Sequence, residues 1–500
     1  MGSCSSCIGF RGRSMRRGSA MNRSGQKKNL LKRMDKCVGV CTHFQSRDNG
    51  WKVENLLPLI QAAGIKIVRQ EIHWHQVEKK KGIYKIPEVY QEWVDKASDA
   101  GLGIIMLLCY GNPIYENPLD PSAFAKYAKF MAGKLKDRNI IAYEIWNEPT
   151  NFRFYEQYGG SWSGKSPSLW RDKFCELLAM SAKDIREEDA ETPIITNTGE
   201  PQFFNMIENE AGSFKHVDGV SHHPYPVIFP PETIPYGGGR ISSQDGVSVA
   251  DDDHSFISLF EMTRRYAEEH LKRGFKTYAT EFGFSTFDHS RHPGWPAGYR
   301  QEAQAAYIVR SLVLAFAAGV QSPCIYDFMD DGTDRYNGEH NFGLIMNEKR
   351  DYEKKQSYHA VRRLIGFLGD SWTHLEKPPA NLIVERTNPK PALFWQAPAQ
   401  EPFLRIRSPQ AFWFDKGDSI LAFVWMGGRI GGEFNDPLGK IIWERPPRIM
   451  PVEIRNLVTG EKLPVKLSPP VRSGQFGERI ILDEIPVGGA PIAIRWKYDR

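Results

Sequence analysis

The chain has 500 residues, of which 41% are hydrophobic and 25% charged, and its formal net charge is +5. This composition excludes a chain that is disordered throughout, and the length exceeds one core, since single cores stop growing at about 250–300 residues. Much of the positive charge lies in the first 36 residues, so it does not predict a nucleic-acid-binding protein. We expect a large α/β domain and a smaller partner.

Residues 1–36 form a basic segment for which we expect a disordered tail. The segment has no apolar run of the kind found in a signal peptide, although its start matches the myristoylation pattern at Gly2. An alternative is a later translation start, at Met15, Met21 or Met34. The sequence therefore leaves two locations open: the cytoplasm, or export if the true start differs. The longest apolar run, 102–110, falls short of the ~20 residues that a transmembrane helix needs.

From residue 37 onward, β-rich runs alternate with amphipathic helical stretches. The runs cover residues 37–44, 66–74, 103–110, 140–149, 193–198, 218–225, 276–284 and 323–331. Runs that are apolar on both faces predict parallel strands covered by helices. Eight such units over about 300 residues favour an α/β fold of the (β/α)8 TIM-barrel type, which we place at 37–372. A doubly wound open sheet is the alternative, but no glycine-rich phosphate loop follows the first run.

The pattern changes after residue 372. From 373 to 500 the chain has short β runs and no helical periodicity, with turn signals such as 456–462 and 487–491 between the runs. This pattern predicts a C-terminal β-sandwich domain.

The carboxyl ends of all strands of a parallel barrel open into the same mouth, where barrel enzymes have their active sites. The side chains that close the predicted strands include His43, Arg69, Asn147, Glu148, Asn197, His223, Tyr225, Glu281, Tyr326 and Asp327. Glu148 and Glu281 are far apart in sequence, yet the barrel would bring them face to face. Two facing carboxylates are what the cleavage of a glycosidic bond uses.

The neighbours of the two glutamates suggest different roles for them. We expect Tyr225 to donate a hydrogen bond to Glu281 and Arg69 to lower its pKa, which keeps this carboxylate ionised. Apolar neighbours such as Trp146 are expected to raise the pKa of Glu148, which would keep it available as an acid.

Other residues are expected to contact a sugar. Asn147 is placed to bind a sugar hydroxyl, and Trp162, in the aromatic-rich segment 151–170, is predicted to stack on a sugar ring. Adjacent side chains on a strand point to opposite faces, so His223 rather than His222 should face the mouth. We further assign His43, Tyr326 and Asp327 to substrate binding, and we expect no cofactor and no metal.

Five motifs together resemble glycoside hydrolase clan A, with family 39-like and family 5-like features. They are 68–84, WNEP at 146–149, HPY at 223–225, TEFG at 280–283 and 326–345. The resemblance implies a retaining mechanism on β-linked glycosides or polysaccharides. In that mechanism Glu281 is the nucleophile, Glu148 is the acid/base, and the carboxyl groups lie ~5–5.5 Å apart.

Several alternatives stay open at this stage. Some clan members carry a histidine after the third strand, where this chain has Tyr110 and Asn112, and these two residues are candidates for the same subsite. The sequence does not separate endo from exo action, or hydrolysis from transglycosylation. A non-catalytic carbohydrate-binding protein on the same barrel is the alternative from another class. The partner is a carbohydrate in each case, and the oligomeric state is left open.

Overall fold

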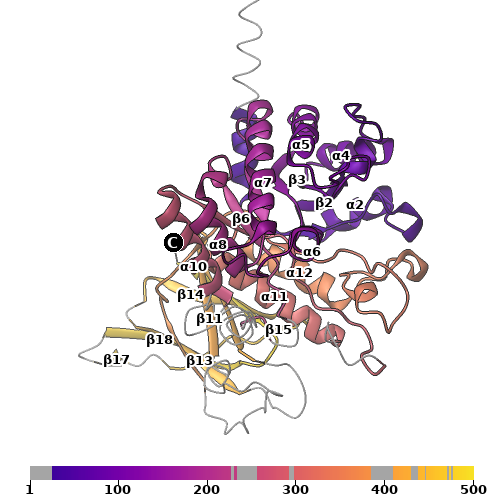
Figure 1. The fold of residues 1–500 in the computed structure, drawn as a ribbon. Helices are drawn as coiled ribbons and strands as arrows, with labels where there is room; N and C mark the ends of the chain where they lie inside the picture. The colour runs from indigo at the N-terminus through magenta and orange to yellow at the C-terminus, as the bar shows by residue number, and fades with distance from the viewer. Residues whose placement is uncertain are drawn as a thin grey trace, which may run out of the picture.

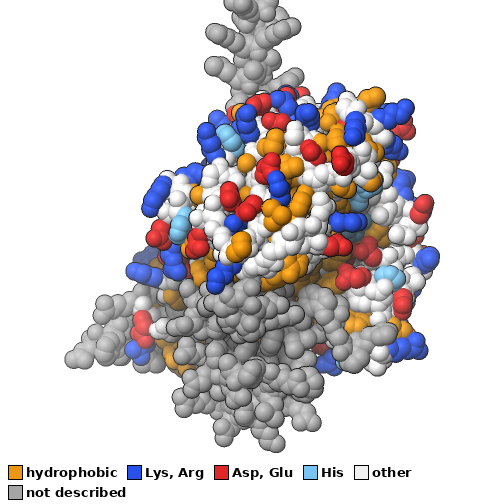
Figure 2. Space-filling model, in the orientation of Figure 1, with side chains coloured by type: hydrophobic (Ala, Val, Ile, Leu, Met, Phe, Trp, Pro, Cys, Tyr) orange, Lys and Arg blue, Asp and Glu red, His pale blue; other side chains and the backbone are white. Residues whose placement is uncertain are grey.

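The computed structural model describes residues 25–226, 230–232, 256–291, 298–384, 409–428, 437–444, 446–469, 472–473 and 477–499. Figure 1 shows a helix-covered part in indigo to orange and a group of β-strands in yellow. The described helices include none that is long and apolar enough to cross a membrane. On the face shown in Figure 2, basic and acidic side chains are interspersed over the described surface of the barrel.

Eight parallel strands form the first part. They are β1 (Gly39–Cys41), β2 (Ile67–His73), β3 (Gly103–Cys109), β4 (Ile140–Ile145), β5 (Ile194–Asn197), β6 (Gly219–His222), β7 (Lys276–Ala279) and β8 (Cys324–Ile325). Strands β1 to β7 pair in chain order, and β1 also pairs with β8. Parallel bridges from Tyr278 to Gln321 and from Phe282 to Ile325 join β7 to the β8 segment. The predicted TIM barrel is confirmed, and the open-sheet alternative is wrong.

Helices surround this barrel (Figure 1). The longer ones are α2 (Val53–Ala62), α4 (Glu88–Asp99), α5 (Pro121–Leu135), α7 (Leu169–Glu188), α8 (Glu200–Glu210), α10 (Phe256–Leu271), α11 (Gln301–Ala317) and α12 (Gln356–Leu368). Short helical segments are η1 (Arg47–Asn49), α3 (Trp74–Val77), α6 (Phe154–Tyr158), η2 (Ala211–Phe214), η3 (Glu339–Asn341) and η4 (Glu348–Arg350). Helix α5 shows a sequence-encoded start, since the Asp120 side chain accepts a hydrogen bond from Ala123 N and Pro121 follows the cap.

The N-terminal segment differs from the expectation of a disordered tail up to residue 36. Residues 25–34 are helical, and Met34 is buried against residues such as Ile67, Ile105 and Ile141 inside the barrel. The apolar residues Leu30 and Leu31 pack there as well, so this helix has an apolar stripe that covers the amino-terminal end of the barrel. Residues 1–24, with the predicted tail and the myristoylation pattern, lie outside the described residues.

The C-terminal part consists of antiparallel sheets. The strands are β9 (Thr373–His374), β10 (Asn381–Val384), β11 (Pro409–Asp415), β12 (Ser419–Met426), β13 (Leu438–Glu444), β14 (Ile449–Asn456), β15 (Lys462–Leu463), β16 (Lys466–Leu467), β17 (Arg472–Ser473), β18 (Gly477–Pro486) and β19 (Ile492–Tyr498). One sheet has the order β15-β14-β19-β12-β11-β9, and the other contains β10-β13-β18-β16. Trp413 and Trp496 of the first sheet contact Trp443 of the second, as the predicted sandwich requires. The domain boundary at 372/373 stays a prediction.

A buried polar cluster joins the two parts. Arg310 of α11 is fully buried and donates to the carbonyl oxygens of Met426 (3.2 Å), Gly428 (2.8 Å) and Gly489. It also lies 3.3 Å from a carboxylate oxygen of Glu232, which accepts a 2.5 Å hydrogen bond from Trp425 Nε1. We call Arg310, Glu232 and Trp425 the interdomain clasp.

Arg310→Ala is expected to destabilise the protein by about 3–5 kcal/mol, because it removes the cation that faces the buried Glu232 carboxylate and leaves three buried carbonyl groups without their donor. Urea unfolding followed by tryptophan fluorescence measures this change. Arg350→Ala, at an exposed position, is the matched control and should change stability by no more than about 0.5 kcal/mol. Equal stability of the two variants would contradict the structural role of the clasp.

Candidate active site

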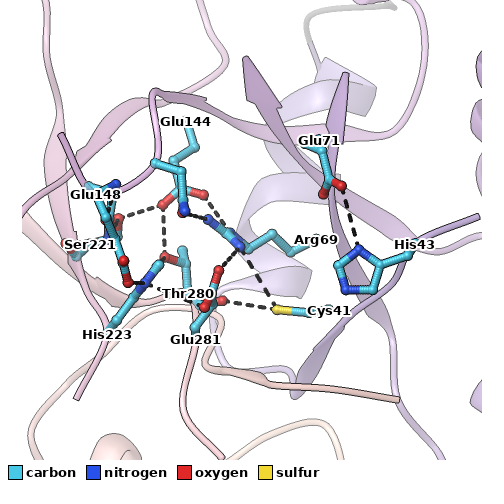
Figure 3. A network of polar contacts seen from close by, with 12 residues as sticks. Cys41, His43, Arg69, Glu71, Glu144, Glu148, Ser221, His223, Thr280 and Glu281 are labelled. Carbon is cyan, nitrogen blue, oxygen red and sulfur yellow. Dashed lines mark hydrogen bonds and ion pairs between the residues drawn. The ribbon is translucent and has the colours of Figure 1, made fainter. Parts of the chain in front are cut away.

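A cavity of about 410 Å³ opens at the carboxyl ends of the barrel strands. Its walls include His43, Arg69, Glu71, Tyr110, Asn147, Glu148, Phe152, His223, Tyr225, Glu281, Tyr326, Glu339 and Phe342. Figure 3 shows that the charged side chains of this region come from several strand ends and point toward one another. The barrel topology therefore gathers most of the sequence-predicted residues in one cavity.

The Glu281 carboxylate is held by two donors. Arg69 Nη1 donates to Glu281 Oε1 at 2.6 Å, and Tyr225 OH donates to Oε2 at 2.9 Å. The Arg69 guanidinium is buried, and its Nη2 also donates to Asn147 Oδ1 at 3.0 Å. These contacts fix the orientation of the carboxylate, as expected from the sequence.

Arg69 is itself fixed by Glu144, a residue that sequence reasoning missed. Arg69 Nε donates to Glu144 Oε2 at 2.6 Å, and Glu144 Oε1 accepts from Ser221 Oγ (2.5 Å) and Thr280 Oγ1 (2.8 Å). Glu144 is completely buried on β4. Its signal in the sequence is a lone acid within the apolar run IIAYEI, because a buried carboxylate needs a charged or hydrogen-bonding partner.

Glu148 lies opposite Glu281. Its Oε1 is 2.6 Å from His223 Nδ1, its Oε2 accepts from Asn151 Nδ2 at 2.8 Å, and its backbone N–H donates to Asn197 Oδ1 at 2.9 Å. One oxygen of each glutamate and a ring nitrogen of His223 all lie within 4.8 Å of one another (Figure 3). His222, in contrast, is buried behind the mouth and bonds to the Thr198 carbonyl.

The expectation of a raised pKa for Glu148 is wrong for this structure. Although burial raises it, the hydrogen bonds from His223 and Asn151 and the charge of Arg69 lower the pKa of Glu148. Burial lowers the pKa of His223, but Glu281 and Glu148 raise it above its ordinary value. Trp146 packs against Phe154 in the core, whereas His223 directly contacts the Glu148 carboxylate.

The backbone around Glu148 is strained. Trp146 and Glu148 have φ angles of 66° and 41°, in the left-handed region that side chains other than glycine rarely adopt. Such positions cost about 1–3 kcal/mol each and persist where the surrounding structure enforces them, often at active sites. The strain lets the chain leave β4 with Asn147 and Glu148 both reaching the cavity.

Three sequence-predicted residues are placed differently. Trp162 is half-buried and lines a neighbouring cavity of about 90 Å³ rather than the main one, although Glu148 and His223 border both. Asp327 is completely buried and does not line the cavity, whereas its neighbour Tyr326 does. Asn112 is also buried and donates to the Glu78 carbonyl, whereas Tyr110 does reach the cavity.

Several wall residues are not among those that the sequence assigns to substrate binding. Glu71 lies on β2 two residues after Arg69, and strand alternation alone assigns both to the same face. Its pKa is lowered to about 2, since His43 and His73 outweigh the effect of burial. Phe152 is 41% exposed at the rim, and no sequence signal distinguishes it from the other aromatic residues of its segment.

The family comparison agrees with this geometry. Residues 24–313, more than half of the chain, match the family model "Cellulase (glycosyl hydrolase family 5)". A search of curated proteins finds no significant match.

Solved structures show the same fold. A family 39 glycoside hydrolase from Bacteroides cellulosilyticus WH2 matches with a TM-score of 0.65 and 18% identity, over 93% of this chain and 81% of that one. A glucosidase from Croceicoccus marinus matches with a TM-score of 0.52 and 10% identity, over 93% of this chain and 97% of that one. The barrel and its cavity with two facing glutamates are consistent with the family model. The chain therefore belongs to the glycosyl hydrolase family 5 and is a glycosidase.

Proposed function

We propose that the protein is a retaining glycosidase of β-linked sugars, with Glu281 as nucleophile and Glu148 as acid/base. Glu281 attacks the anomeric carbon while Glu148 protonates the departing glycosidic oxygen, so one C–O bond forms as the other breaks. Water, deprotonated by Glu148, then attacks the anomeric carbon of the glycosyl ester and releases Glu281.

The observation that carries this proposal is the separation of the two carboxylates. One oxygen of each carboxylate lies within 4.8 Å of the other, which fits the ~5–5.5 Å between the carboxyl groups of a retaining enzyme better than the ~6.5–9.5 Å of an inverting one. The different environments support the division of roles. Glu281 has two donors that fix the orientation of its carboxylate, as suits a nucleophile, and Glu148 bonds a titratable imidazole that can supply a proton.

Product stereochemistry tests the mechanism directly. Aryl β-glycosides and β-linked polysaccharides are screened first, and proton NMR of the best substrate should show the β-anomer as the first product. An α-anomer formed first would rule out retention. Mass spectrometry of the same mixtures separates single sugars from oligosaccharides, and thus exo from endo action. Products longer than the substrate would identify transglycosylation, for which the same residues suffice.

The Glu148–His223 pair should control the alkaline side of the pH profile. The pair holds one proton between the lowered pKa of Glu148 and the raised pKa of His223, and activity falls once this proton is lost at higher pH. His223→Asn removes the second site for that proton. The alkaline limb of the kcat/KM profile should move to lower pH by about 1–2 units, because the variant loses one hydrogen bond to a charged group, whose free energy corresponds to a shift of this size.

The control for this variant is His270→Asn, because His270 is exposed on α10 and remote from the cavity. Its pH profile should match that of the wild type. An unchanged alkaline limb in His223→Asn would show that the histidine does not share the catalytic proton.

The charges of the cavity wall favour neutral sugars over uronic acids. Four carboxylates line the cavity: Glu71, Glu148, Glu281 and Glu339. The basic side chains of the wall are already paired with acids. Arg69 bonds Glu144 and Glu281, His43 faces Glu71, and His223 bonds Glu148. We expect kcat/KM for an aryl β-glucuronide to be at least about tenfold below that for the aryl β-glucoside, because like charges repel in a partly desolvated site. Glu339→Gln should reduce the difference between the two kcat/KM values. A preference of the wild type for the glucuronide would contradict the prediction.

A further inference from the structure

A second group of potential ligands lies beside the cavity, with His43 of the cavity wall as one member. His43 follows β1, whereas Asp327 and Asp331 follow β8, and one ligand atom of each lies within 4.8 Å of the other two. Within the described residues, the other group of this kind is Glu148, His223 and Glu281, whose role is proposed above. The group around Asp327 has no part in that chemistry.

Atoms without partners point into this second group. Asp327 is completely buried, and neither of its carboxylate oxygens has a hydrogen-bond partner among the described residues. The Nε2 atom of His43 is also buried and has no hydrogen-bond partner there, since the Asp331 carboxylate is 4.0 Å away. Buried polar atoms are nearly always satisfied, so three such atoms in one place indicate that a group is missing from the contacts.

The surroundings orient two of these side chains, His43 and Asp331, as the outer contacts of a metal site do. His43 Nδ1 faces Glu71 Oε1 at 3.5 Å (Figure 3), and Glu71 is itself fixed by a 2.6 Å hydrogen bond from Gln45 Nε2. Trp51 Nε1 donates to Asp331 Oδ1 at 2.8 Å, which leaves Oδ2 on the side of His43 Nε2, 4.0 Å away. A metal-bound histidine typically gives its other ring N–H to a carboxylate, and metal-bound carboxylates are hydrogen-bonded in turn.

The nearby cation, Lys355, is not the missing partner of Asp327. Lys355 Nζ is buried, but it bonds Asp330 Oδ1 at 2.6 Å and also donates to Thr286 Oγ1 at 3.0 Å. Lys355 therefore neutralises Asp330, while Asp327 and Asp331 face the imidazole of His43.

We propose that His43, Asp327 and Asp331 bind a divalent transition-metal ion, for which Zn²⁺ is the best match to one imidazole and two carboxylates. The ion would join the end of β1 to the segment after β8, where the barrel closes on itself. It would also fix the His43 ring, which lines the substrate cavity. This role is structural and differs from the sequence-based expectation, in which Asp327 contacts the sugar and no metal is present.

Zinc binding is measured on the full chain in a Glu148→Gln/Glu281→Gln background, which removes the other ligand group. After treatment with a chelator, calorimetric titration with Zn²⁺ and elemental mass spectrometry should find one ion per chain. Asp327→Asn and Asp331→Asn should each weaken binding by at least about 10–100-fold. Asp334→Asn, at an exposed position of the same loop, should bind as the background does.

Mn²⁺ provides a second measurement that does not require the aspartate variants to fold. The electron spin-echo spectrum of Mn²⁺ bound to the same background should show coupling to one imidazole nitrogen, and His43→Gln should remove it. Absence of this coupling, absence of a bound ion, or unchanged zinc affinity in both aspartate variants would overturn the proposal.

Discussion

Glu281→Gln is expected to lower kcat for an aryl β-glycoside by about 10⁴–10⁶-fold, the range found when a catalytic nucleophile is removed. The amide has the size of the carboxylate but cannot form the glycosyl ester. Arg69 keeps its bond to Glu144, so the protein should stay folded. Steady-state kinetics measure the loss, and thermal unfolding checks the fold.

Glu339→Gln is the matched control, since it also removes a carboxylate from the cavity wall. It should change kcat by less than about tenfold, which corresponds to under about 1.4 kcal/mol in the barrier. If Glu281→Gln and Glu339→Gln lose the same small factor, Glu281 is not the nucleophile.

Glu148→Ala is expected to lower kcat by about 10²–10⁴-fold, because general acid–base catalysis contributes a factor of this size. With a good leaving group, the glycosyl ester still forms but water attacks it slowly without a base. Stopped-flow absorbance should therefore show a burst of the released phenol followed by slow turnover.

Azide separates the two roles. It needs no base, so it should restore turnover in Glu148→Ala and give the β-glycosyl azide. In Glu281→Gly it should occupy the position of the missing carboxylate and give the α-azide. The same anomer from both variants, or no rescue in either, would contradict the assignment.

The fold could be predicted because its signals are local and repeated. Each strand of the barrel is an apolar run between helical stretches, and the polar residue at each run's end marks the mouth. The two short strands β1 and β8 have only a few paired residues, yet their apolar character is enough to predict them from the sequence. The helix at 25–34 was missed because its charged residues outweigh the few apolar ones in composition, although those few are buried.

The site was predictable in its residues but less so in its electrostatics. Tyr225 and Arg69 were assigned to Glu281 from strand ends alone, and the structure has both contacts. The pKa of Glu148 was predicted in the wrong direction because it depends on His223, whose distance from the carboxylate is set by the tertiary structure. Tyr326 and Asp327 are adjacent in the sequence, yet Tyr326 lines the cavity and Asp327 is buried outside it. The sequence does not distinguish these two environments.

The interdomain clasp bears on how the enzyme can be engineered. Glu232 lies a few residues past Tyr225, on the chain that leaves β6, and its contacts reach α11 and the sandwich. An excised barrel would lose Trp425, which binds Glu232, and the carbonyl groups that bind Arg310. The sandwich is therefore not an interchangeable attachment, and exchanges between related enzymes should transfer both parts together.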